Sequence, residues 1–161
     1  MGHFDKSICD CCVCPMKCVL MQLMEQQITV DFLRTTFGQI NIPFTIDRIE
    51  DFIVFTDQGN IAICQIVALG LNMEADIKLK PIRKNIVGEC ACCEDPMTNL
   101  LNSMKEQQIS IPSSTITEAT IAGVGEGIVL LKDLITNTGV EFDSGVASTC
   151  ALDIVAPPIK K

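Results

Sequence analysis

The sequence predicts a mainly β (α+β) fold made of two tandem modules. Each module is expected to be a short N-terminal helix followed by a small antiparallel β-barrel or sandwich of about four or five strands. Three observations predict this fold: an ungapped internal repeat, helical spacing of apolar residues at the head of each copy, and period-two alternation after each helix.

The repeat begins at a cysteine-rich run, Cys9-Asp10-Cys11-Cys12, which returns as Cys90-Ala91-Cys92-Cys93. A Pro-Met pair and a Glu-Gln-Gln-Ile run follow in both copies at a constant offset of 81 residues. A period this long that occurs twice indicates a duplicated small domain rather than a solenoid. The expected segments are a cysteine-rich arm (1–14), a first module (15–71), a linker (72–89), a second and divergent module (90–156) and a tail (157–161).

Helices are predicted directly after each cysteine run. Pro15 suits a first helical position because its missing N–H costs nothing there, and Asp95 stands before Pro96 as an expected N-cap. Apolar residues then recur at helical spacing, which predicts a core face on each helix. These residues are Met16, Val19, Leu20 and Leu23 in the first copy and Met97, Leu100, Leu101 and Met104 in the second.

Strands are predicted where the period changes to two. In the first copy the expected strands are 28–32, 39–42 and 44–49, then a hairpin of 52–56 and 61–69 around the turn 57–60. The run 61–69 is apolar on both faces, which predicts a strand that lies centrally or against a second surface. In the second copy, 128–131 and 148–152 correspond to 53–55 and 62–66, and the linker has an expected short strand at 77–79.

Composition narrows the classes of function. The net charge is −8, which argues against binding to nucleic acid or to an anionic membrane surface. No apolar run reaches the roughly 18 residues of a membrane-spanning helix, and the first residues lack a secretory h-region. Synthesis in a cytosol without a signal peptide is therefore expected.

Ten cysteines conflict with that compartment if they form disulfides. Metal binding, reactive thiols, or oxidation after release from the cell would each resolve the conflict. Beyond the cysteines near the head of each copy, each module carries one cysteine in its last predicted strand, Cys64 and Cys150. Such pairs can close disulfides within a module or between the arm of one subunit and the module of the next. The crosslinking candidates are Cys9, Cys11, Cys12, Cys14, Cys18, Cys64, Cys90, Cys92, Cys93 and Cys150.

Three alternatives remain beside crosslinking. Zinc or an iron–sulfur cluster is the cofactor alternative, although the cysteine spacing matches neither a structural zinc site nor a ferredoxin run. Buried reduced cysteines that act as small hydrophobes are credible for Cys18, Cys64 and Cys150. A small-barrel adaptor that binds a protein partner would need neither crosslinks nor metal.

Little in the chain predicts catalysis, and no enzyme is expected. The one histidine, His3, stands on the arm, and the run Gly123-x-Gly125-x-Gly127 lacks the spacing of a dinucleotide fingerprint.

The run Cys11-Cys12-Val13-Cys14-Pro15-Met16-Lys17-Cys18-Val19-Leu20 resembles small cysteine-rich proteins of the spore coat, exosporium and spore appendages of endospore-forming bacteria. The resemblance covers about residues 9–30 and again 90–111. It implies an N-terminal connector that docks on the β-sandwich of a neighbouring subunit and is locked by disulfides. This chain departs from that pattern by its tandem duplication and by the helix after the connector.

Together these observations predict a non-enzymatic structural protein with no resident cofactor, which self-assembles and is crosslinked at the spore surface. Its expected partners are copies of itself and other cysteine-rich spore-surface proteins. Cys9, Cys11, Cys12 and Cys14 are the expected donor arm, with Cys64 and Cys150 as receptors. Cys90, Cys92 and Cys93 are expected to tie the second module to itself or to the first.

Overall fold

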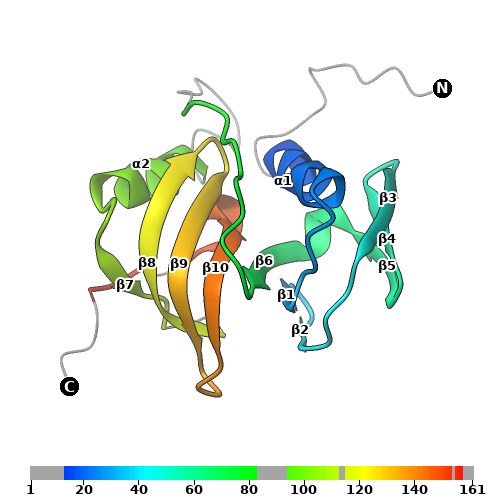
Figure 1. Cartoon of the computed structure of the whole chain (residues 1–161). Helices are drawn as coiled ribbons and strands as arrows, with labels where there is room; N and C mark the ends of the chain where they lie inside the picture. The colour runs from blue at the N-terminus through cyan, green and yellow to red at the C-terminus, as the bar shows by residue number, and fades with distance from the viewer. Residues whose placement is uncertain (1–12, 83–93, 113–114, 154, 158–161) are drawn as a thin grey trace.

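The computed structural model describes residues 13–82, 94–112, 115–153 and 155–157. This part of the chain is mainly β, with two α-helices, one seven-stranded antiparallel sheet and one three-stranded antiparallel sheet (Figure 1). The predicted closed barrels are wrong, because neither sheet closes on itself within the described residues.

Helix α1, Val13–Glu25, follows the predicted pattern. Its buried side chains are Pro15, Met16, Val19, Leu20 and Leu23. The helix is followed by Gln27, whose φ of 55° lies in the left-handed region. The Ile28 N–H donates to the Leu23 carbonyl at 3.0 Å, so the chain turns sharply and buries Ile28 beside the helix.

The strands of the first half divide between the two sheets. Their bounds are β1 Phe32–Thr35, β2 Gln39–Ile40, β3 Ile46–Glu50, β4 Ile53–Thr56, β5 Gly59–Ala62 and β6 Ile66–Leu71. Strands β3, β4 and β5 form the small sheet, and β2, β1 and β6 join the large one. The predicted strand 61–69 is therefore two strands, separated by the 3-10 helix η1, Ile63–Gln65. The short helix lets one apolar run contribute to two sheets.

The second half is a meander of longer strands. Helix α2, Asp95–Ser103, is followed by β7 Gln108–Ser110, β8 Ile116–Gly125, β9 Ile128–Thr136, β10 Glu141–Ser148 and the 3-10 helix η3, Thr149–Ala151. The strand predicted at 148–152 is wrong, since η3 occupies most of it. Leu100 was predicted on the core face of α2 but is 45% exposed, whereas Leu101 is buried.

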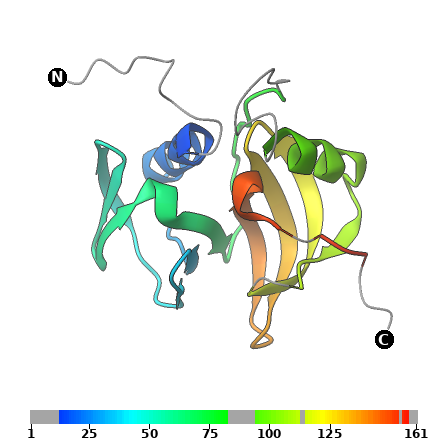
Figure 2. The ribbon, with the colours of Figure 1, turned by 180° about the vertical axis from the view of Figure 1, so that it is seen from behind.

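One sheet joins the two halves of the chain. Its strand order is β2-β1-β6-β10-β9-β8-β7, so β6 of the first half pairs with β10 of the second (Figure 2). The central place predicted for the run 61–69 is confirmed for its part in β6, whereas residues 61–62 lie in β5, at the edge of the small sheet. Gly70 stands directly opposite Gly145 at this junction.

Strand β6 also serves two hydrophobic cores. Leu69 and Leu71 belong to the cluster that α1 covers, and Ala68 belongs to the cluster around Leu101 of α2. Alternate residues of a strand face opposite sides of its sheet, so one strand can supply both clusters. Burial of both faces explains why this strand has no polar side chains.

The first part of the predicted linker is fixed rather than free. The Gln22 side-chain amide donates to the Lys78 carbonyl at 3.0 Å and accepts from the Lys78 N–H at 2.7 Å. On the other side, the Glu126 N–H donates to the Lys80 carbonyl at 3.1 Å. The strand predicted at 77–79 is wrong, because side-chain and loop contacts replace a strand partner there.

Within the described residues, no helix combines the length and apolar character that crossing a bilayer requires.

Candidate functional site

Four cysteines lie in the described part of the chain. Cys14 stands in the first turn of α1 and Cys150 at the centre of η3, and each is disulfide-bonded. Cys18, one helical turn after Cys14, and Cys64, at the centre of η1, carry free thiols. The other six predicted crosslinking residues, Cys9, Cys11, Cys12, Cys90, Cys92 and Cys93, lie outside the described residues.

The two strand cysteines occupy equivalent positions. Each is the middle residue of a three-residue 3-10 helix, and the residue before it, Ile63 or Thr149, is about 1% exposed. The flanking backbone matches as well: φ and ψ are −70° and 126° at Ala62, and −76° and 124° at Ser148. The correspondence of these two segments, first seen in sequence, therefore extends to local structure.

Each 3-10 helix also packs against the α-helix of its own half. Helix α1 contacts η1, and α2 contacts η3. Each strand cysteine therefore lies on a 3-10 helix that contacts the α-helix following, in sequence, the cysteine run of the same copy. The two cysteines differ in accessibility, because Cys64 is exposed and Cys150 is only half-exposed.

Around Cys64 the contacts are local. The Gln65 side-chain amide lies 3.7 Å from the Cys64 sulfur. The Thr36 N–H donates to the Gln65 carbonyl at 3.0 Å, and the Thr36 hydroxyl is hydrogen-bonded to the Gln65 side chain. Thus η1 is tied to the loop after β1, while its thiol faces solvent.

Beside Cys150 lies a buried polar cluster that the sequence did not predict. The Thr98 hydroxyl donates to the Glu94 carboxylate at 2.5 Å and is hydrogen-bonded to the Thr149 hydroxyl at 3.0 Å. The Gly127 N–H also donates to Glu94, at 2.8 Å. The cluster joins the start of α2 to the β8–β9 turn and to η3, next to the Cys150 disulfide.

Burial makes the Glu94 carboxyl of this cluster a weaker acid. Glu94 is only 1% exposed, and desolvation raises the pKa of its carboxyl above the ordinary value. A hydrogen bond and charge repulsion from the neighbouring Asp95 also raise this pKa, whereas the hydrogen bonds from Thr98 and Gly127 lower it. Desolvation is the largest contribution, so the carboxyl favours its neutral form more strongly than an exposed glutamate does.

Glu94, rather than the predicted Asp95, is the N-cap residue of the second helix. Asp95 is the first helical residue of α2. No side chain caps the helix at this residue; the Glu94 carboxylate instead bonds Thr98 and Gly127. The four-residue spacing of Glu94 and Thr98 could have indicated their hydrogen bond from the sequence. The bond from Gly127 to Glu94 could not be predicted, because the two residues are distant in sequence and only the fold brings them together.

For the metal alternative, the described residues contain no group of three or more His, Cys, Asp or Glu side chains that could hold an ion. The cysteine run of each copy lies outside these residues, apart from Cys14 and Cys18.

Comparison of the chain with protein-family models, with curated proteins and with solved structures finds no match.

Proposed function

We propose that this chain is a non-enzymatic structural protein that self-assembles and is then crosslinked through its cysteines. The observation that carries the proposal is the equivalence of Cys64 and Cys150 on matching 3-10 helices. One of them is already in a disulfide, and the other is an exposed free thiol. A second copy of the chain can supply the cysteine that Cys64 lacks.

The two-module organisation belongs to the same proposal. A helix that contacts a 3-10 helix with a central cysteine occurs once in each half. The duplication supplies two receptor cysteines: Cys150 is already in a disulfide, and Cys64 is a free thiol that can still form one. The donor is one of the arm cysteines, Cys9, Cys11 or Cys12, of a neighbouring chain.

The crosslinking step is the oxidation of two thiols to a disulfide. The Cys64 thiol and an arm thiol each lose a proton and together give two electrons as the S–S bond forms. A low-molecular-weight disulfide such as oxidised glutathione accepts the electrons and leaves as two thiols. Such an oxidant becomes available to a cytosolic protein when the cell lyses, which fits a spore surface as the final location and other cysteine-rich surface proteins as additional partners.

A denaturing gel tests the proposal. The full chain is incubated with oxidised glutathione, alkylated at once, and run with and without reductant. The expected result is a ladder that collapses to 17.5 kDa on reduction. In Cys64→Ser the ladder should be lost. The matched control is Cys18→Ser, which removes the half-buried free thiol of α1 and should keep the ladder.

A monomer in both lanes with thiols open to alkylation would overturn the proposal. A ladder of full intensity in Cys64→Ser would show that Cys64 is not the open receptor. Stoichiometric zinc or iron in the purified protein, together with unfolding by a chelator, would favour the metal-binding alternative instead.

A further inference from the structure

Strand β2 forms one edge of the seven-stranded sheet. It pairs with β1 through Leu33↔Ile40 and Arg34↔Gln39, and no strand of the described residues pairs with its other side. An open edge presents backbone N–H and C=O groups that another strand can use. We call residues 36–42, which contain β2, the edge segment.

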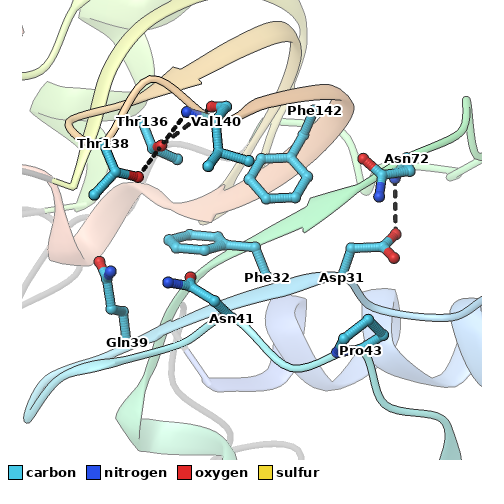
Figure 3. A pocket seen from close by; sticks show the side chains of 10 residues that line it. All are labelled: Asp31, Phe32, Gln39, Asn41, Pro43, Asn72, Thr136, Thr138, Val140 and Phe142. Carbon is cyan, nitrogen blue, oxygen red and sulfur yellow. Dashed lines mark hydrogen bonds between the residues drawn. The ribbon is translucent and has the colours of Figure 1, made fainter.

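The edge segment exposes both polar and apolar side chains. Gln39 and Asn41 line a pocket of about 260 Å³ and face the β9–β10 turn, where Thr138 and Val140 stand (Figure 3). The alternate residues Ile40 and Ile42 are 37% and 58% exposed. Gln39 and Asn41 are exposed as well, so the amides border the pocket while the two isoleucines add apolar surface to the same edge.

Phe37 extends this apolar surface. It is 91% exposed at the turn between β1 and β2, the highest value among the large apolar side chains that the structure describes. Phe37, Ile40 and Ile42 therefore stand within six residues on one open edge. Exposed apolar clusters of this kind mark association surfaces.

The absence of charge on the edge segment allows two copies of this chain to meet there without repulsion. The chain carries a net charge of −8, so two copies repel over most of their surfaces. Between Arg34 and Asp47, however, no residue is charged. Native edges are commonly protected by short strand length, charged side chains or proline; β2 is only two residues long, but residues 36–42 contain neither a charge nor a proline.

We propose that two copies of this chain associate by pairing their edge segments antiparallel about a two-fold axis. The same apolar side chains of each copy then pack together, as an isologous contact requires. This inference rests on the proposed self-assembly and names its non-covalent surface. It also connects to the crosslink, because Thr36 of the edge segment bonds Gln65, the neighbour of Cys64.

The experiment measures association without any new disulfide. The free thiols of the full chain are alkylated, which keeps the existing disulfides, and molar mass is followed against concentration by sedimentation equilibrium. A reversible dimer is expected. Ile40→Lys introduces like charges at the contact and should weaken the dimer by at least about tenfold.

Two further variants keep the result interpretable. Leu100→Lys adds the same charge at an exposed apolar residue of α2 and should leave the dimer unchanged. Phe37→Ser changes a side chain that contributes almost nothing to the folded core, so its expected weakening of the dimer does not depend on a folding defect.

A monomer at all concentrations would overturn the inference, as would equal weakening by Leu100→Lys and Ile40→Lys. If that monomer still gives the glutathione-dependent ladder before alkylation, the edge contact is wrong and the crosslinking proposal stands. If the dimer forms but no ladder appears, the crosslinking proposal fails and the edge contact stands.

Discussion

The backbone N–H of Gly127 donates a hydrogen bond of 2.8 Å to the buried carboxylate of Glu94. The bond spans 33 residues of sequence and fixes the start of α2 against the β8–β9 turn. The carboxylate is held in an almost fully buried position beside Asp95.

Glu94→Gln should change how stability depends on pH. The pKa of Glu94 is raised in the folded state, so above pH 4.5 the folded chain still holds a proton that the unfolded chain has released. The free energy of unfolding of the parent should therefore fall as pH rises from that value to the folded pKa, by up to about 1.4 kcal/mol per pH unit from this group. The glutamine variant should lack this fall.

Urea unfolding between pH 5 and 8 measures the effect as the difference between the two proteins. Glu74→Gln, which removes one exposed carboxylate, is the control for the loss of a charge. If the difference between Glu94→Gln and the parent is constant across that range, the pKa of Glu94 is not raised.

Thr98→Val should destabilise the chain by about 1–3 kcal/mol. The change keeps the shape of the side chain but removes the hydroxyl that bonds both Glu94 and Thr149. Two buried polar groups then lose a partner, and that loss costs more than the hydrogen bond itself contributes. Thermal unfolding detects the change, with the exposed Asn99→Ala on the same helix as control. Equal stability of Thr98→Val and the parent would show that the cluster contributes nothing.

Gly145→Ala should weaken the junction between the two halves. An added Cβ would lie 2.5 Å from the Leu69 carbonyl oxygen and 2.6 Å from a Leu134 methyl carbon. The carbonyl belongs to the paired strand and cannot rotate away, so we expect a loss of about 1–3 kcal/mol or more.

Gly38→Ala is the matched control for this substitution. No atom lies within 4 Å of its added Cβ, and its φ is not positive, so the free energy of unfolding should change by no more than about 0.5 kcal/mol. Denaturant unfolding compares the two variants, and similar values for both would contradict the packing seen at β6 and β10.

Gln22→Ala should release the segment that follows β6. The variant loses both hydrogen bonds between the Gln22 amide and the Lys78 backbone, which are solvent-exposed and together contribute about 1 kcal/mol. Amide hydrogen exchange at Lys78 should accelerate, while exchange in β9 should not change. Unchanged protection at Lys78 would mean that packing alone holds the segment.

The local features of this protein follow from its amino-acid sequence. Period and spacing correctly predicted the buried face of α1, the turn after β4 and the central place of β6, because these patterns depend on neighbouring residues alone. The repeat also predicted that the segments around Cys64 and Cys150 correspond, and both form the same 3-10 helix.

The way in which these elements combine depends on the tertiary structure. A separate barrel or sandwich was expected in each module, but β6 and β10 pair, with Gly70 opposite Gly145, so one sheet runs through both halves. Likewise, Glu94 binds Gly127 rather than capping its own helix, and Gln39 and Asn41 border a pocket with Thr138 and Val140 of the β9–β10 turn. The physical reason is shared: each outcome depends on contacts between residues distant in sequence, and local propensity and periodicity carry no information about such partners.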